Sequence, residues 1–230
     1  MIQNIPLEKV LFLDIETVPQ YGTWEEIPDT EQILWDKKTK YQRKNEIEAE
    51  DFYDRAGIMA EFGKIICITV GMVEKNDALK IKSFADDDEK KLLLEFGELF
   101  NSPKLRDVIL CAHNGKEFDF PWIARRFLIN GMQPPTPFQL FGKKPWEIPH
   151  IDTMELWKFG DYKSFVSLEL LAHVFGIPTP KDDIDGSMVS SIYYIEKDLQ
   201  RIVDYCEKDV LTLANIFRRM RQEDLLKRYS

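Results

Sequence analysis

Four acidic side chains, spread over almost the whole chain, interrupt segments that otherwise read as buried. Asp14 and Glu16 follow the apolar run Val10–Leu13, Asp119 follows a buried strand and its turn, and Asp209 lies on an amphipathic helix. Carboxylates out of water are strongly unfavourable unless they are neutralised. Divalent cations usually do this, and oxygen ligands favour Mg²⁺ or Mn²⁺ over zinc. The four acids therefore predict a fold that brings them together around bound metal ions. Such a site indicates metal-dependent phosphoryl transfer.

The composition predicts one large globular domain. The 230 residues are 44% hydrophobic and 12% aromatic, which suits a substantial core. Lys and Arg total 31 against 40 Asp and Glu, a formal charge of −9. Such a charge argues against a passive nucleic-acid-binding module held by bulk electrostatics. It leaves room for an enzyme whose metal ions and a few local basic residues contact phosphates.

The three cysteines are an odd number and have no CxxC spacing. Cys67 and Cys111 fall inside apolar runs, which predicts buried free thiols rather than disulfides or a zinc site. The N-terminus lacks the features of a signal peptide, and no stretch approaches 18 consecutive apolar residues. We therefore expect a cytoplasmic protein without membrane contact.

Five short runs are typical of strands, because they are continuously apolar or alternate with period two. They are Val10–Leu13, Ile65–Val70, Leu79–Phe84, Val108–Cys111 and His150–Asp152. The second and third are expected to form a hairpin that turns near residues 75–77. A helical pattern begins after Asp88, which is its expected N-cap. Three further helical patterns cover Phe120–Ile129, Ser167–Phe175 and Lys197–Lys227. Residues 133–149 are rich in proline and are expected to form an irregular loop.

Residues 24–61 differ from the rest because charged side chains alternate there with aromatic ones. We interpret them as a helical insertion after the first strand, within a single domain of residues 1–230. Its aromatic residues are expected to anchor it to the core. The alternative is that the insertion covers a substrate.

Asp14 and Glu16 are two residues apart, so in a strand both carboxylates lie on one face and can hold the same ion. The simpler interpretation is a strand end that turns into solvent.

Asp119 follows the turn His113–Phe118 and opens a helix, where an acid is also an ordinary N-cap. Asn114 in that turn faces whatever binds at the end of the strand.

Tyr205 and Asp209 are one helical turn apart and therefore neighbours on one face. Asp209 lies at the edge of the helix's apolar stripe, with Tyr205 just beyond it. A partly exposed Asp paired with a Lys or Arg is the simpler interpretation. In the metal interpretation, Asp209 contributes to the same site as the other three acids.

Together the three segments resemble the motif set of the DEDD exonucleases, the ribonuclease-H-like superfamily of 3′–5′ exonucleases. DxE matches Asp14-Ile15-Glu16, the second motif matches Asn114 through Asp119, and the third matches Tyr205 and Asp209. Tyrosine in the third motif resembles the DEDDy subclass. The continuation Phe118–Ile123 resembles the proofreading exonuclease domain of family B DNA polymerases, here as a stand-alone protein. The implied fold is α/β and ribonuclease-H-like, a mixed central β-sheet flanked by α-helices.

The resemblance implies that Asp14, Glu16, Asp119 and Asp209 hold two divalent ions, Mg²⁺ or Mn²⁺, about 4 Å apart. Tyr205, neutral near pH 7, then aims the attacking water rather than removing its proton. Further substrate contacts are implied for five residues. They are Ile15, Thr17, Asn114, Phe118 and Ser167.

Residue chemistry alone leaves simpler roles open for two of these substrate contacts. The alternatives are core packing for Phe118 and a plain N-cap for Ser167. Arg125, Arg126 and Lys163 are weaker candidates for phosphate contacts.

The activity that follows is removal of nucleoside 5′-monophosphates from a 3′ end, with single-stranded DNA as the favoured substrate. An RNA exonuclease of the same fold is the nearest alternative, because sugar discrimination depends on contacts that the motifs do not fix. A non-catalytic module that binds nucleic acid or a protein partner is the second alternative. It has no need of a buried acidic cluster. A third is an interaction protein acting through residues 24–61.

Overall fold

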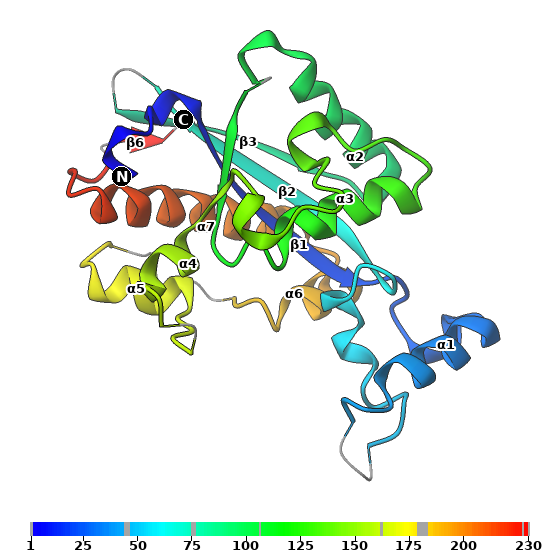
Figure 1. Cartoon of the computed structure of the whole chain (residues 1–230). Helices are drawn as coiled ribbons and strands as arrows, with labels where there is room; N and C mark the ends of the chain where they lie inside the picture. Colours follow the sequence, from blue (N-terminus) through cyan, green and yellow to red (C-terminus); the bar gives the residue numbers. More distant parts are fainter. Residues whose placement is uncertain are drawn as a thin grey trace.

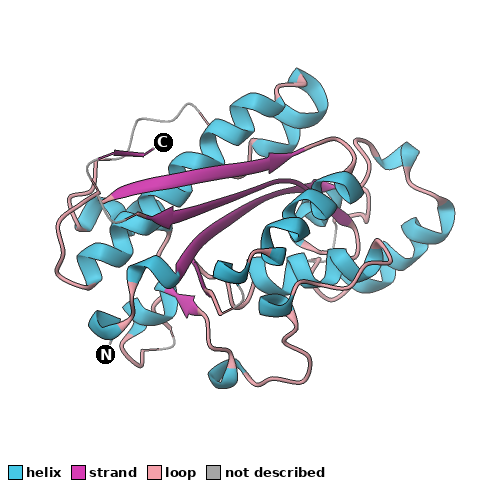
Figure 2. Cartoon of the chain, turned by 90° about the horizontal axis from the view of Figure 1, so that it is seen from above, coloured by secondary structure: helices cyan, strands magenta, loops and turns pink. Residues whose placement is uncertain are grey.

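A mixed β-sheet runs through the centre of the molecule with helices on both faces (Figures 1 and 2). Its strands are β1 (Val10–Pro19), β2 (Gly63–Val73), β3 (Ala78–Ala85), β4 (Ile109–Ala112), β5 (Ile151–Asp152) and β6 (Arg228–Tyr229). In the described part of the chain their order is β5-β4-β1-β2-β3-β6. β1 runs antiparallel to β2 and parallel to β4, so the sheet is mixed as predicted.

The structure is a computed structural model, and it describes most of the chain. The described residues are 2–43, 47–74, 77–105, 107–161, 163–178, 184–226 and 228–229. The expected β2–β3 hairpin is confirmed by antiparallel pairing from Cys67 opposite Ala85 to Val73 opposite Leu79. Residues 75 and 76 of its predicted turn lie outside the described residues.

Side-chain alternation along β1 divides the core into two layers. Leu11, Leu13 and Ile15 pack into a cluster with α2 (Glu89–Glu98) and α3 (Asp119–Ile129). Val10 and Phe12 point the other way and pack against α7 (Leu199–Met220). The Phe12 and Phe217 rings meet edge to face, 5.9 Å apart, which fixes α7 against the sheet.

An ion pair is buried beneath the α2–α3 face of the sheet. Arg126 Nη2 donates to Glu89 Oε2 at 2.5 Å, and the two residues are only 5% and 7% exposed. Glu89 Oε1 also accepts the backbone N–H of Ile65 at 2.7 Å, and Arg126 Nη1 donates to the Ala60 carbonyl. Arg126 is therefore a structural residue that joins two helices to β2, and the hypothesis that it contacts phosphate is wrong.

The remaining helices lie between β5 and α7. They are α4 (Thr153–Lys158), α5 (Leu168–Val174) and α6 (Val189–Ser191), the last continuing into a π-helical turn over Ile192–Glu196. Asp88 caps α2 and Ser167 caps α5 through their side chains, as predicted. The loop expected at residues 133–149 contains only two short 3₁₀ turns. Among helices in the described residues, none is long and apolar enough to cross a membrane.

The final helix is shorter than predicted, ending at Met220 rather than near Lys227. Gln222 adopts a left-handed conformation with φ 63°, and the Glu223 N–H returns to the Arg218 carbonyl. Arg221 then donates to the carbonyls of Ile2 and Ile5 near the start of the chain. A helix continued past this point would lose these contacts.

The insertion between β1 and β2 contains α1 (Asp29–Thr39) and a 3₁₀ helix (Tyr53–Ile58), and it extends from one corner of the molecule (Figure 1). The expectation that its aromatic residues join the main core is wrong. Trp35 and Tyr53 form a separate small cluster, with Trp35 fully buried and its Nε1 donating to the Ala49 carbonyl at 2.8 Å. Phe62 and Tyr21, which flank the insertion, complete this cluster, and the Phe62 ring lies 5.2 Å from that of Trp35.

Replacing Arg126 with Ala should lower the free energy of unfolding by about 3–5 kcal/mol, because Glu89 is left as an unpaired buried charge. Urea denaturation measures the change. Arg125 lies next to it on α3 but is exposed, so Arg125→Ala is the matched control and should change stability by less than about 0.5 kcal/mol. Equal effects of the two variants would contradict the structural role of the ion pair.

Candidate active site

Two of the four acids interrupt the α7-facing side of β1. Asp14 and Glu16 continue the alternation of Val10 and Phe12, and Val18 resumes it as an apolar residue buried near α7. Glu16 is 8% exposed and Asp14 is partly buried. Both acids thus lie within the strand and face into the protein, and the interpretation of a strand end in solvent is wrong.

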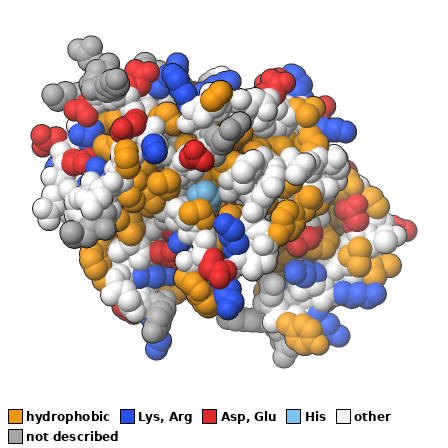
Figure 3. Space-filling view, turned by 45° about the horizontal axis from the view of Figure 1, so that its top comes forward, with side chains coloured by type: hydrophobic (Ala, Val, Ile, Leu, Met, Phe, Trp, Pro, Cys, Tyr) orange, Lys and Arg blue, Asp and Glu red, His pale blue; other side chains and the backbone are white. Residues whose placement is uncertain are grey.

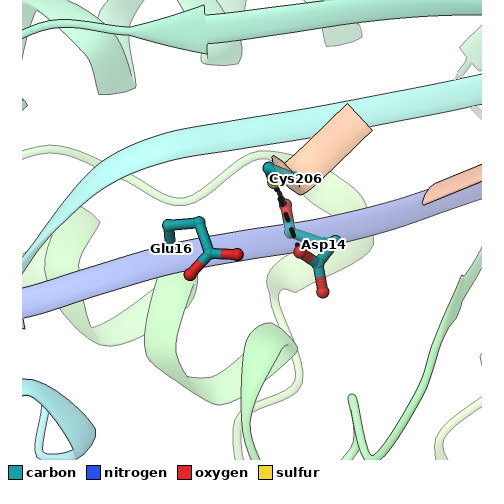
Figure 4. Close-up of side chains that lie close together, drawn as sticks. All are labelled: Asp14, Glu16 and Cys206. Carbon is teal, nitrogen blue, oxygen red and sulfur yellow. Dashed lines mark hydrogen bonds between the residues drawn. The ribbon is translucent and has the colours of Figure 1, made fainter. Parts of the chain in front are cut away.

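α7 brings the third motif to the same place. Cys206 faces β1 from this helix, and its thiol donates to Asp14 Oδ2 at 3.2 Å (Figure 4). The Tyr205 hydroxyl is hydrogen-bonded to the Asp209 carboxylate one turn along. Ile202 and Val210, one turn to either side of Cys206, pack in the apolar layer between α7 and the sheet. The polar residues of the third motif therefore lie between two apolar contacts along the helix.

Asp119 reaches the site from the opposite layer. It is the first residue of α3 and 4% exposed, but Phe118 holds the N-cap position, so the expectation of an ordinary N-cap at Asp119 is wrong. Its carboxylate accepts backbone hydrogen bonds from Ile15 and from its own residue. Ile15 is paired with Ile68 of β2 on one edge of β1, whereas pairing with β4 on the other edge stops at Phe12, so Asp119 reaches β1 where β4 leaves it open.

The turn before α3 is held by a buried acid from β5. Asp152 Oδ1 accepts the N–H of Asn114 at 3.0 Å and Oδ2 accepts that of Lys116 at 3.1 Å. Asn114 has φ 61°, a left-handed conformation that Asn tolerates better than most residues. At Gly115 a Cβ atom would meet that of Ala112 at 2.3 Å, so no larger residue fits. The turn is therefore held in place by the Asp152 carboxylate and by its close packing against Ala112.

Burial, followed by repulsion between neighbouring carboxylates, determines the electrostatics of the site. Burial raises the pKa of Asp14 well above its usual range, and the nearby carboxylates of Asp209 and Asp119 raise it further. Burial, and then Asp14 and Asp209, likewise raise the pKa of Glu16. Burial raises the pKa of Asp119 to about 7. Burial and the Asp209 charge raise the pKa of Tyr205, which is therefore a neutral hydroxyl near pH 7.

These residues fit a divalent cation. Asp14, Glu16 and Cys206 each offer one ligand atom, and the three atoms lie within 4.8 Å of one another. Glu16 is only 8% exposed, so its carboxylate has little contact with solvent. A cation nearby would satisfy it and reverse the repulsion. Asp119 and Asp209 lie close enough to act on Asp14 but belong to no such three-atom group in the described residues.

The predicted substrate residues lie in different settings. The Ile15 side chain is 5% exposed on the α2–α3 side, so only its backbone faces the acids. Thr17 Oγ1 donates to the Gly57 carbonyl in the insertion at 2.6 Å. Phe118 packs against the core and the Trp122 ring, with 6.0 Å between ring centroids. Ser167 is exposed, and its hydroxyl accepts the Leu170 N–H that caps α5.

Sequence reasoning missed Cys206 as a neighbour of the acids. Its spacing of four from Ile202 and Val210 places it on the apolar stripe of the helix, and nothing in a single sequence reveals a contact with a residue 192 positions away. The sequence favours a cap at the end of a strand for Asp152, with a supporting role beside the site as the alternative. Asp152 does both, because it caps α4 through Met154 and Glu155 and also accepts the N–H of Asn114, 38 positions away.

The comparisons with known proteins agree with this geometry. A family described as "Predicted 3'-5' exonuclease related to the exonuclease domain of PolB" matches residues 58–225. The chain belongs to this family. The matched region of this exonuclease domain contains Asp119, Tyr205 and Asp209, whereas Asp14 and Glu16 precede it. A search of curated proteins finds no match.

The family B DNA polymerase of the hyperthermophilic archaeon Pyrobaculum calidifontis has a similar structure. The TM-score is 0.50 at 14% sequence identity, and the match covers 89% of this exonuclease-family chain. It covers 23% of the polymerase, so the chain spans less than a quarter of that protein's length. The shared architecture confirms the predicted ribonuclease-H-like α/β fold.

The raised carboxyl pKa values predict how stability depends on pH in chelator. Between the unfolded pKa of about 3.9 and the folded pKa of about 7, folded Asp119 keeps a proton that the unfolded chain releases. Stability therefore falls with rising pH in this window, by up to about 1.4 kcal/mol per unit for this group. Asp119→Asn should remove that part of the slope in urea titrations. Parallel pH profiles for the two proteins would contradict the assignment.

Proposed function

We propose that this chain is a metal-dependent 3′–5′ exonuclease of the DEDDy subclass that acts on single-stranded DNA and releases nucleoside 5′-monophosphates. The observation that carries the proposal is the set of carboxylates buried between β1 and α7, each raising the pKa of another. A binding module or an interaction protein gains nothing from such an unfavourable arrangement. Membership of a predicted exonuclease family supports the same conclusion.

The proposed metal ligands are Asp14, Glu16, Asp119 and Asp209. Bound divalent ions, Mg²⁺ or Mn²⁺, supply a nucleophilic hydroxide near neutral pH and stabilise the leaving 3′-oxygen. Asp119 is pre-positioned for this by the Ile15 backbone, and Asp14 by the Cys206 thiol. Ligands held in this way need little rearrangement during the reaction, which is the main source of electrostatic catalysis.

Tyr205 is proposed to aim the attacking water. Its raised pKa excludes a role as a base near neutral pH, so it acts as a hydrogen-bonding hydroxyl. Its bond to Asp209 sets the direction of that hydroxyl beside the proposed metal ligands. The proposed role is therefore positioning, with the proton accepted elsewhere.

The segment after α4 supports a single-stranded substrate. Phe165 is 68% exposed, and the Lys158 ammonium lies 4.4 Å from its ring centroid. The next residue, Val166, accepts a hydrogen bond from His113 at 2.8 Å, which ties this segment to the turn containing Asn114. Exposed aromatic rings beside cations are typical platforms for unpaired bases. Figure 3 shows acidic and basic side chains interspersed over one face, without the broad basic stripe typical of duplex binding.

The test is an assay on a 5′-labelled single-stranded DNA oligonucleotide with Mg²⁺, with Mn²⁺ and with chelator. We expect a metal-dependent ladder that shortens from the 3′ end. Asp14→Asn should lower kcat by about 100-fold or more, because a ligand worth several kcal/mol is removed. Asp204, an exposed acid on α7, provides the matched control Asp204→Asn, which should retain activity.

Three results of this assay would change the proposal. A ladder on RNA but not on DNA would replace the substrate while retaining the reaction. Absence of a ladder on both, from folded protein, would favour the binding module. An unchanged rate in Asp14→Asn would remove Asp14 from the catalytic centre.

Tyr205→Phe should lower kcat by about 3- to 10-fold, the effect of one hydrogen bond worth about 0.5–1.5 kcal/mol, and leave metal affinity unchanged. Single-turnover kinetics and calorimetric Mn²⁺ titration measure the two quantities. Tyr41→Phe is the control, because Tyr41 is 96% exposed on the insertion. A Tyr205→Phe enzyme with the wild-type rate would exclude Tyr205 from the mechanism.

A further inference from the structure

The outer face of α1 combines apolar and basic side chains. Trp35 lies on the inner face and is fully buried in the insertion's own cluster, whereas Ile33 and Leu34 on the other side are each more than half exposed. Lys37 and Lys38 follow one helical turn later on the same side, because residues four apart on a helix are neighbours. The side of α1 that faces solvent is therefore a mixed apolar and positively charged surface.

An exposed aromatic ring ends this surface. Tyr41 lies four residues after Lys37 and is 96% exposed. The turn that carries it is closed by hydrogen bonds from the Gln42 and Arg43 N–H groups to the Thr39 carbonyl, at 2.7 and 3.0 Å. The ring is therefore held by an ordered turn and is open to solvent, as stacking on another planar group requires.

The surface is positively charged in a chain that is acidic overall. Residues 37–43 contain four basic residues and no acid, against a formal charge of −9 for the whole chain. Arg43 pairs with Asp36, so its charge is neutralised within the insertion. The other three are exposed lysines, namely Lys37, Lys38 and Lys40. The helix dipole accounts for lysines in a last turn, but not for the exposed apolar and aromatic side chains beside them.

The insertion attaches this surface to the end of β1 that carries the acids. Thr17, the residue after Glu16, donates to the Gly57 carbonyl at 2.6 Å, and the Gln20 N–H donates to the Phe62 carbonyl at 2.8 Å. From there α1 extends outward at one corner of the molecule (Figure 1). Any contact between α1 and a strand whose 3′ end lies among the acids is therefore made by nucleotides further from that end.

We propose that the outer face of α1 binds a single-stranded nucleic acid several nucleotides from its 3′ end. The lysines contact phosphates and the Tyr41 ring stacks on a base, the combination typical of surfaces that bind unpaired strands. The residues of this surface are Ile33, Leu34, Lys37, Lys38, Lys40 and Tyr41. Its role as a second contact region for the substrate rests on the proposed nuclease function, whereas binding of a single strand does not.

An acidic protein segment is the other occupant whose charge complements the lysines. Attachment of the insertion to the β1 end of the active site favours the nucleic acid, because that is the strand on which the site is proposed to act.

Anisotropy of a labelled single-stranded DNA oligonucleotide measures binding in chelator, where no metal supports cleavage. The triple variant Lys37→Gln, Lys38→Gln, Lys40→Gln should lower the slope of log affinity against log salt by about 2, because each phosphate contact on a single strand contributes about 0.7. Tyr41→Ala should weaken binding about fivefold or more, whereas Tyr41→Phe keeps the ring and should bind like the wild type. These side chains are exposed, so the changes should leave the protein folded.

A second triple variant is the matched control. Lys9, Lys90 and Lys104 are exposed and lie outside the insertion, so replacing all three with Gln removes the same charge. The salt slope and the affinity should stay close to those of the wild type. Equal losses in the two triple variants would reduce the effect to overall charge and overturn the proposal.

Cleavage kinetics with Mg²⁺ test where along the strand α1 acts. On a strand of about 16 nucleotides, the triple variant in α1 should raise KM about fivefold or more and leave kcat unchanged. On a trinucleotide, which is too short to extend from the acids to α1, both constants should equal those of the wild type. An equal rise in KM on both substrates would place the lysines at the active site itself and overturn the proposal.

Binding and cleavage together separate this surface from the proposed activity. Oligonucleotide binding that depends on the lysines, without cleavage, would support the surface and refute the nuclease function. Cleavage together with oligonucleotide binding that is unchanged in both the lysine and Tyr41→Ala variants would do the reverse. Binding of a synthetic oligoglutamate peptide to these lysines, without binding of the oligonucleotide, would replace the strand by an acidic protein segment.

Discussion

Packing of α7 against one face of β1 is the contact on which the site depends, because it buries carboxylates that repel one another. The apolar residues on either side of them, from Phe12 against Phe217 to Val18 beside Ile202, supply the burial that offsets this repulsion. Loss of solvent raises the pKa values of Asp14 and Glu16 and strengthens every charge interaction in the site. The attraction between these carboxylates and a bound cation is therefore stronger than it is at an exposed acidic cluster.

The opposite face of the sheet keeps the remaining site residues in place. The buried pair of Arg126 and Glu89 fixes α3 relative to α2 and β2, and Asp119 begins that same α3. Asp152 fixes the preceding turn through the Asn114 and Lys116 N–H groups. Polar networks of this kind, fully satisfied and buried, favour one arrangement over nearby alternatives.

Sequence patterns predicted the strands and most helices, because apolar period and capping residues are local signals. Asp88 and Ser167 formed the expected side-chain caps. Local reasoning failed where distant contacts decided the outcome. The final helix stops early because Arg221 bonds to the first residues of the chain. The Trp35 side chain of the insertion packs in a small cluster apart from the main core. Neither the partners nor their distances are encoded in a local pattern.

The sequence by itself determined which residue types are available to the site and at what spacing. The i, i+2 period of a strand put Asp14 and Glu16 on one face, and the helical turn made Tyr205 and Asp209 neighbours. Tertiary structure alone decided that these two faces meet, with Cys206 donating to a carboxylate 192 positions earlier. The reason is that side-chain direction follows from backbone geometry within an element, whereas contact between elements follows from how their apolar faces pack.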